Sequence, residues 1–152
     1  MFRSYSAVNL HAVFATKDRN PYLRDRNLRI EMHAYIAGVS KTLGCPTLIV
    51  GGVEDHVHVL AGQGKEVSQS DWINEIKRVS SLWAKRRDEA WSEFAWQRGY
   101  GIFSVSPDAV SSLRRYIETQ EEHHRTQSFE DEFVRLLEQH GMAWDARDSL
   151  NE

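Results

Sequence analysis

The fold of this chain is decided by the stretch Thr47-Leu48-Ile49-Val50-Gly51-Gly52-Val53-Glu54-Asp55-His56-Val57-His58-Val59-Leu60. Two short apolar runs, residues 47–50 and 57–60, flank a pair of glycines and a pair of acids, and this pattern predicts a β-hairpin. Side chains two residues apart leave a strand on the same face, so His56 and His58 share one face with Cα atoms roughly 6.5 to 7 Å apart. Val57 and Val59 then point to the opposite face, where helices can cover them.

Working outward from the hairpin, the hydrophobic spacing alternates between the periods of strands and helices. The predicted elements are a strand over 4–16, a helix over about 25–43, the strands 47–50 and 57–60, a helix from about 72 to 87, a strand or bent hairpin over 94–105, a helix from 106 and a last helix from 128. Ser106-Pro107-Asp108 predicts the start of the helix that carries Tyr116, because serine caps, proline suits the first turn and aspartate complements the helix dipole.

The element order of strand, helix, strand, strand, helix, strand and further helices is the split βαβ or ferredoxin-like plan. We therefore predict an α+β fold, ferredoxin-like (RRM-like), with a four- or five-stranded, mainly antiparallel sheet and helices on one face. The length favours a single domain over residues 1–152, with a core over about 4–140 and a polar, loose tail over 141–152.

Composition restricts the class of protein further. The chain has 152 residues, 41% of them hydrophobic, and no apolar run near the roughly 20 residues that span a bilayer. Met1 to Leu10 lack the features of a signal peptide, so a soluble, cytoplasmic protein with no membrane contact is expected. The net charge of -3 argues against a general nucleic-acid coat protein, although basic residues cluster locally. The lone Cys45 has no thiol partner and is expected to be buried.

Two residue patterns can support chemistry. Two imidazoles from one strand face can bind a divalent ion, although an isolated His-x-His is more often a pair of polar residues on a wet sheet face. Tyr116 and Gln120 are four residues apart, so they lie on one face of the predicted helix, and His123 extends that row. Taken alone, the spacing of Tyr116 is more typical of a half-buried tyrosine with its hydroxyl in water.

Four blocks in order closely resemble the single-tyrosine transposases of the HUH (His-hydrophobic-His) superfamily, which includes insertion-sequence and REP-associated tyrosine transposases. The blocks are SAVNLHAVFATKDR (residues 6–19), GGVEDHVHVL (residues 51–60), WQRGYGIFSVS (residues 96–106) and YIETQEEHH (residues 116–124). The resemblance covers about residues 4 to 135, and four blocks in the right order are far more specific than any single His-x-His.

The resemblance implies a function and a site. By analogy, His56 and His58 match the metal-binding pair, Gln120 matches the third metal ligand and Tyr116 matches the nucleophile. The family implies a homodimer that uses Mg²⁺ or Mn²⁺ to cut single-stranded DNA at hairpin-flanked sites. Tyr116 would become linked to the 5′ phosphate and release a 3′ hydroxyl, which can later attack the phosphotyrosine and rejoin DNA without ATP.

Elementary chemistry also favours a metal ion beside an attacking tyrosine. A phenol with a pKa near 10 attacks phosphate poorly unless a cation withdraws charge from the phosphate or a base takes the proton. Two neutral imidazoles and an amide oxygen leave the charge of a metal ion unquenched, and the two nitrogens favour manganese over magnesium in vitro. The residues expected to contact the DNA backbone are Lys17, Arg19, Lys77, Arg78 and Arg98. Trp96 or Tyr100 can stack on an unpaired base, unless both fill the core.

Three alternatives stay open. A non-catalytic RNA- or DNA-binding domain uses the same fold plan but leaves the histidines and Tyr116 unexplained as a set. A metal-dependent hydrolase would need a carboxylate base, for which Glu54, Asp55 and Glu118 are available, although Asp55 points away from His56 in a regular strand. A domesticated member of the family would process repeated palindromes by the same chemistry.

Overall fold

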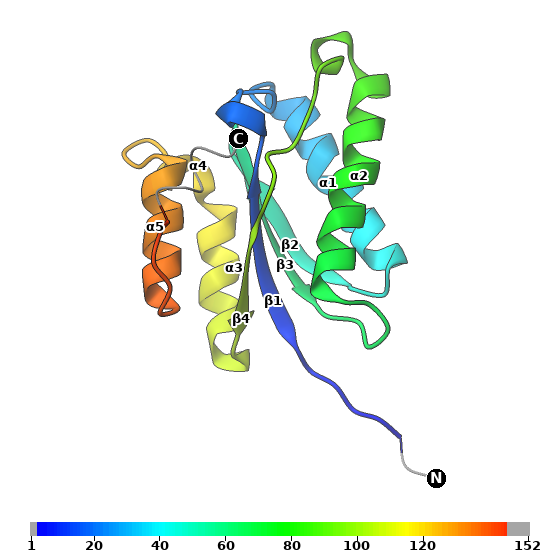
Figure 1. The fold of residues 1–152 in the computed structure, drawn as a ribbon, viewed down its shortest axis with the longest axis vertical. Coiled ribbons are helices and arrows are strands. Elements are labelled where there is room, and N and C mark those ends of the chain that lie inside the picture. Colours follow the sequence, from blue (N-terminus) through cyan, green and yellow to red (C-terminus); the bar gives the residue numbers. More distant parts are fainter. Residues whose placement is uncertain (1–2, 146–152) are drawn as a thin grey trace.

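One antiparallel sheet organises the computed structural model, which describes residues 3–145 (Figure 1). Its strands in this part of the chain are β1 (Asn9–Ala15), β2 (Thr47–Gly52), β3 (His56–Gly62) and β4 (Gly101–Val105). The strands lie in the order β2-β3-β1-β4, so the hairpin strand β3, which carries the two histidines, is central and pairs with β1 on one side and β2 on the other.

Two long helices cover one face of the sheet. Helix α1 (Arg26–Thr42) begins where the Asp25 carboxylate accepts from two backbone N–H groups, and α2 (Gln69–Arg87) begins at the equivalent cap from Ser68. Buried side chains of both helices pack on the valines that alternate with the histidines along β3. This apolar layer fixes which face of β3 the histidines take.

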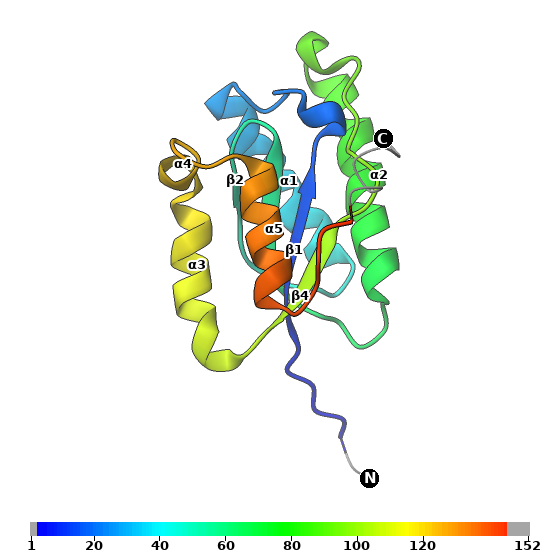
Figure 2. The same cartoon turned by 60° about the vertical axis from the view of Figure 1, so that its left-hand side comes forward.

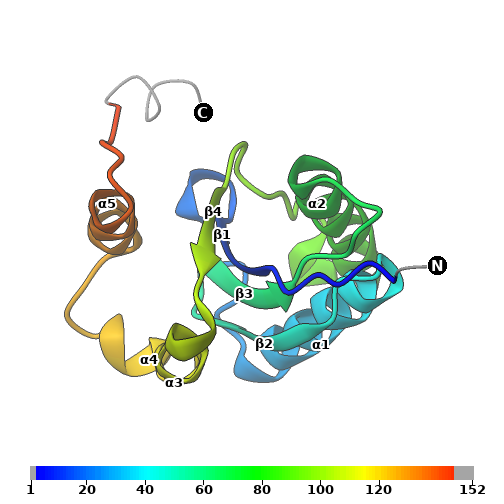
Figure 3. The ribbon, with the colours of Figure 1, turned by 90° about the horizontal axis from the view of Figure 1, so that it is seen from below.

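Three further helices lie against the opposite face (Figures 2 and 3). They are α3 (Val110–Glu118), α4 (Gln120–His123) and α5 (Phe129–Gln139). Phe129 and Leu136 of α5 pack on Val13 and Phe103, which come from β1 and β4. The α5 helix therefore stands over the sheet face that carries His56 and His58.

The predicted α+β, ferredoxin-like plan is confirmed in element order and in the antiparallel sheet. The C-terminal helices add a second helical layer to the one that the sequence predicts. The stretch 94–105 forms a strand only from Gly101, and Trp96 contributes a single bridge to Thr16. Cys45 is buried and free, as predicted.

The chain ends beyond the described residues. The predicted loose tail over 141–152 falls partly there, since residues 146–152 lie outside the part that the structure describes. Among the helices of residues 3–145, none combines the length and the apolar character that crossing a bilayer requires.

Candidate active site

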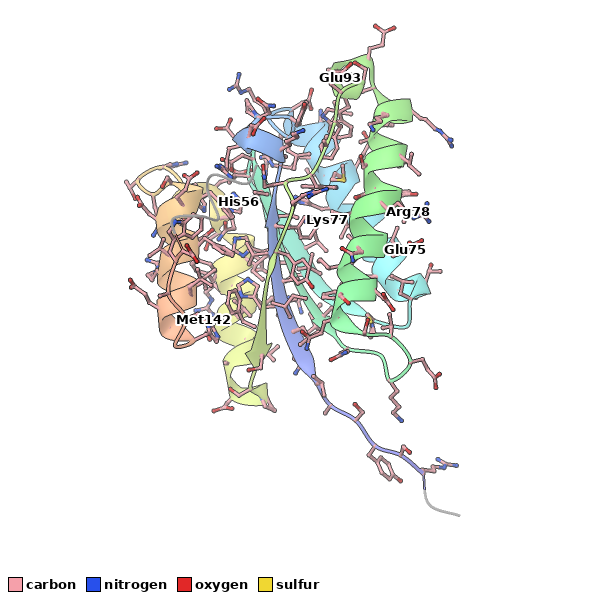
Figure 4. The ribbon with its side chains drawn as sticks, in the orientation of Figure 1. His56, Glu75, Lys77, Arg78, Glu93 and Met142 are labelled. Atoms are coloured by element: carbon pink, nitrogen blue, oxygen red, sulfur yellow. The ribbon has the colours of Figure 1, made fainter. Side chains whose placement is uncertain are left out.

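The two histidines of β3 both point toward the C-terminal helices. His56 and His58 are fully buried, and their ring centroids lie 5.1 Å apart. Val57 and Val59 belong to the core on the other face, as period-two alternation predicts. Figure 4 shows His56 between the sheet and the α3 to α5 layer. The pair is thus enclosed between β3 and helices, and the interpretation of a wet sheet face is wrong for this chain.

Tyr116 and Gln120 reach the same enclosure from α3 and α4. The helix breaks at Thr119, where φ is -105° and ψ is 26°, yet both side chains stay on one side. Close packing of α3 on β2 sets this position, because a Cβ at Gly51 would lie 2.7 Å from the carbonyl oxygen of Ile117. Only glycine at this strand position lets the tyrosine helix lie so near the sheet.

The four residues that resemblance assigns to the site come together within one chain. The Gln120 Oε1 atom lies 3.1 Å from Nε2 of His56. The Tyr116 ring lies edge-on to His58, with centroids 6.0 Å apart. The tyrosine of this chain therefore docks beside its own histidine pair.

Glu132 on α5 is the site residue that sequence reasoning missed. Its carboxylate is fully buried and contacts every member of the predicted set. Oε1 lies 3.1 Å from Nε2 of His56 and 3.0 Å from Nε2 of His58, while Oε2 accepts hydrogen bonds from Gln120 Nε2 at 3.0 Å and from the Tyr116 hydroxyl. One signal was available: Glu132 interrupts the apolar row of Phe129, Phe133 and Leu136 at helical spacing.

Asp55 is closer to the site than the sequence indicated. Its Oδ1 atom lies 2.8 Å from Nδ1 of His56. The prediction that Asp55 points away assumed a regular strand, but β3 begins at His56, so alternation does not reach Asp55. The other carboxylates considered for a hydrolase, Glu54 and Glu118, are exposed and pair with Arg24 and Arg114.

Two more histidines surround the pair. Nε2 of the buried His11, from β1, lies 2.8 Å from Nδ1 of His58. Nε2 of His124, which directly follows α4, lies 3.1 Å from Glu132 Oε1. Each imidazole of the β3 pair is therefore held on its outer nitrogen, His56 by Asp55 and His58 by His11.

The electrostatics follow from burial and from Glu132. Burial opposes a charge on His56, but hydrogen bonds to Asp55 and Glu132 outweigh it and raise the pKa of His56 to about 9. Burial lowers the pKa of His58. Burial and then the hydrogen bond to Glu132 raise the pKa of Tyr116 to about 12. Burial also opposes the charge of Glu132, yet the histidines hold the pKa of this carboxyl well below its usual range.

The donor set fits a divalent cation. Among the described residues, His56, His58 and Glu132 each offer a ligand atom, and these atoms lie within 4.8 Å of one another. Imidazole nitrogens together with carboxylate and amide oxygens suit Mn²⁺ and related ions better than Mg²⁺, which prefers oxygen alone. Asp55 on His56 and His11 on His58 are contacts of the kind that orient metal-binding imidazoles.

The residues predicted to contact DNA are not members of this buried cluster. The turn over Lys17–Arg19 joins the loop after Trp96, since Asp18 N donates to Gln97 Oε1 at 2.9 Å. Lys77 reaches the same loop from α2 and donates to the carbonyls of Gln97 and Gly99 at 2.8 and 2.5 Å (Figure 4). Lys17, Arg19 and Arg98 belong to these two loops and Lys77 contacts the second, while the Arg78 guanidinium pairs with Glu75 on α2.

These basic residues differ in exposure and in their ion pairs. Lys17 and Arg98 are exposed, whereas Arg19 forms an ion pair with Glu130 of α5 at 2.8 Å. Burial lowers the pKa of Lys77 to about 8. Trp96 packs between Phe14 and Phe94, as the core interpretation predicts, whereas 40% of Tyr100 is exposed.

An α+β fold with a four-stranded sheet and a His-x-His pair that faces a tyrosine-bearing helix defines the class of this protein. The family model described as "Transposase IS200 like" matches residues 4–120. This chain belongs to the IS200-like transposase family. The match ends at Gln120, so α5 and Glu132 lie outside it.

Solved structures share the fold. A candidate transposase from Deinococcus radiodurans R1 is 21% identical with a TM-score of 0.60, over 79% of this chain and 96% of that one. A REP-associated tyrosine transposase bound to a REP hairpin is 13% identical with a TM-score of 0.58, over 82% of this chain and 73% of that one. No curated protein matches the sequence.

Proposed function

We propose that this protein is a transposase that cleaves and rejoins single-stranded DNA through a covalent bond to Tyr116. The single observation that carries the proposal is that the half-buried Tyr116 and the buried His56, His58 and Gln120 lie together within the family-matched segment. A phenol, two imidazoles and an amide, drawn from three elements, together suit metal-assisted attack on phosphate.

The proposed reaction exchanges one phosphoester bond for another and needs no cofactor other than the metal ion. The phenolic oxygen of Tyr116 attacks the scissile phosphorus, the bond from phosphorus to the 3′ oxygen breaks, and that oxygen takes a proton. The products are a 5′-phosphotyrosine and a free 3′ hydroxyl. Another 3′ hydroxyl can later attack the phosphotyrosine and restore a DNA strand, because the energy of the bond is kept.

His56, His58 and Gln120 would hold the divalent metal, Mg²⁺ or Mn²⁺. The ion, when bound, supplies positive charge next to the phosphate and so eases attack by a phenol. Such help is needed, since a phenol is protonated at neutral pH and is then a weak nucleophile. Asp55 and His11 fix the direction of the two imidazoles.

The substrate proposal has two supports. The solved REP-associated tyrosine transposase of similar fold is bound to a REP hairpin. Lys17 and Arg98 are exposed on neighbouring loops and can contact phosphates, with Arg19, Lys77 and Arg78 nearby. We propose single-stranded DNA with a hairpin as substrate, a homodimer as the working assembly, and one domain over the chain.

The burial of the site limits how a DNA phosphate can reach the histidines. His56, His58 and Glu132 are fully buried, so a phosphate has no path to the histidines while α5 is seated. Cleavage therefore requires α5 to move, and with it the Glu132 carboxylate that accepts from Tyr116.

A covalent adduct tests the function. The full chain is mixed with single-stranded DNA from the flanks of its own gene and with Mn²⁺ or Mg²⁺, then resolved on a denaturing gel. We expect a heat-stable protein-DNA adduct that a chelator and Tyr116→Phe both abolish, and that the exposed control Tyr5→Phe retains. Binding without an adduct across hairpin-bearing sequences would favour a non-catalytic binder.

One observation favours a second candidate function. A hydrolase needs a carboxylate at the ion, and Glu132 provides one next to both histidines. Metal-dependent cleavage that survives Tyr116→Phe and leaves no adduct would establish hydrolysis instead of strand transfer.

A further inference from the structure

Glu132 is the most heavily engaged side chain of the site, yet it lies outside the segment that the family model matches. It sits in the first turn of α5, a helix that is joined to α4 only by residues 124–128. Its carboxylate is within hydrogen-bond distance of the groups His56, His58, Gln120, His124 and Tyr116. A helix of this chain's own C-terminal segment therefore reaches the centre of the site.

A fully buried carboxylate needs strong compensation. Transfer of an unpaired carboxylate from water to an apolar interior costs so much that buried acids are paired, neutralised or bound to a metal. The surroundings of Glu132 are imidazoles, an amide and a phenol, without lysine or arginine in contact with it in the described structure. A divalent ion bound beside the carboxylate compensates its negative charge directly.

The spacing of the atoms fits a shared ion. Oε1 of Glu132 lies 3.0 to 3.1 Å from Nε2 of both histidines, and Oε1 of Gln120 lies 3.1 Å from Nε2 of His56. Ligand atoms at right angles around an ion with bonds of about 2.1 Å are about 3 Å apart. The outer nitrogens of both imidazoles are engaged by Asp55 and His11, so the inner nitrogens are the ones aimed at Glu132.

We propose that Glu132 is a protein ligand of the divalent cation, which it binds together with His56 and His58 in the DNA-free protein. The inference rests on the metal site of the proposed function. It assigns a metal-binding role to α5, because the ion joins a side chain of α5 to two side chains of β3. Metal binding and the docking of α5 therefore stabilise each other.

Metal affinity tests the assignment without any DNA. The probe is Mn²⁺ added to the full chain, with free Mn²⁺ read by electron paramagnetic resonance. We expect Glu132→Gln, which keeps the shape of the side chain, to raise the Kd for Mn²⁺ at least tenfold. Glu138→Gln makes the same chemical change at an exposed position of α5 and should leave the Kd unchanged. Equal or tighter binding by Glu132→Gln overturns the proposal.

A second measurement avoids any variant that fails to fold. Hydrogen exchange of the wild-type chain is followed with and without Mn²⁺. Slower exchange of the α5 amides, residues 129–139, on adding Mn²⁺ supports the proposal, whereas protection confined to β3 and α4 overturns it. Suppose that protein-DNA adducts form normally, Mn²⁺ leaves the exchange of α5 unchanged, and Glu132→Gln binds Mn²⁺ as tightly as wild type. The ligand assignment then fails and the transposase function stands. Absence of Mn²⁺ binding by the wild-type chain rejects the proposed metal site and the ligand together.

Discussion

Nε2 of His11 lies 2.8 Å from Nδ1 of His58, and the two rings stack with centroids 5.1 Å apart. The two residues come from the central strands β1 and β3. Burial and then the charge of His58 lower the pKa of His11 to about 3, so the His11 ring is neutral and holds Nδ1 of His58 by a hydrogen bond. This contact fixes the direction of the His58 ring, whose Nε2 lies 3.0 Å from Oε1 of Glu132.

The first prediction concerns this contact. His11→Leu removes the hydrogen-bond partner of Nδ1 of His58 and no longer holds that ring in place, so the Kd for Mn²⁺ should rise about 10- to 100-fold. His33→Leu removes an imidazole from α1 and should leave the Kd unchanged. A His11→Leu protein that folds and binds Mn²⁺ as tightly as wild type would remove His11 from the site.

The second prediction concerns the close approach of the tyrosine helix to the sheet. Gly51→Ala places a methyl group against the backbone of Ile117, next to Tyr116, and should cost about 1–3 kcal/mol of unfolding free energy by overpacking. Adduct formation should fall as well, because α3 moves.

The matched control for that change is Gly38→Ala. Gly38 lies inside α1 and a Cβ there meets nothing within 4 Å, so the change should stabilise the protein by about 0.5–1 kcal/mol. Urea denaturation of both variants measures the two free energies. Equal effects of the two changes would show that the Ile117 contact is unimportant.

The third prediction concerns pH. Burial and then the charge of Arg29 lower the pKa of His33 from its ordinary value of 6.5 to about 4, and its Nε2 atom has no hydrogen-bond partner. Between pH 6.5 and 4 the unfolded chain binds a proton at His33 that the folded chain does not, so stability falls as pH falls.

Removal of the imidazole should lessen that loss. Between pH 7 and pH 4 the wild-type protein should lose up to about 3 kcal/mol more than His33→Leu does, a figure reduced by the partial exposure of the side chain. Urea denaturation at pH 7, 5.5 and 4 measures the difference. Parallel losses in the two proteins would mean that His33 is protonated as easily in the fold as in the unfolded chain.

The fourth prediction separates DNA contacts from structural cations. Arg98 is exposed on the loop after Trp96, so Arg98→Ala should weaken single-strand binding and reduce the slope of log affinity against log salt by about 1. Arg86→Ala, an exposed arginine nine residues beyond Lys77 on α2, should leave the slope unchanged. A slope that responds equally to both variants would indicate a diffuse surface in place of a local one.

Lys77 should behave differently from Arg98. Its ammonium group holds two backbone carbonyls of the 97–99 loop, so Lys77→Met should lower the melting temperature more than Arg98→Ala does. Thermal unfolding by circular dichroism compares the two. A melting temperature of Lys77→Met equal to that of wild type would return Lys77 to the set of simple phosphate contacts.

The sheet and the first two helices could be predicted because each element has a hydrophobic pattern that extends over only a few neighbouring residues. Alternation around His56 and His58 and the helical spacing of α1 and α2 depend on neighbours within a few residues. The positions of Tyr116 and Gln120 on one side followed from the same local rule, even though Thr119 breaks the helix between them.

What could not be predicted depends on contacts between distant segments. In the sequence, Glu132 is an ordinary acid in the first turn of a helix, where the helix dipole favours a negative charge. Only the docking of α5 on β3 brings its carboxylate to the two histidines. Asp55 was misjudged because the alternation of a regular strand was extended to a residue that precedes β3. His11 gave no signal beyond its place in a β-strand, since its partner is 47 residues away.

The separate attachment of α5 has a consequence for evolution and engineering. Tyr116 and the histidine pair lie in the family-matched segment, while the Glu132 carboxylate comes from α5, which follows the short connection 124–128. The proposed nucleophile and the proposed carboxylate ligand therefore belong to separate segments of the chain. Substitutions in α5 can alter the proposed metal site while every residue of the family-matched segment stays unchanged.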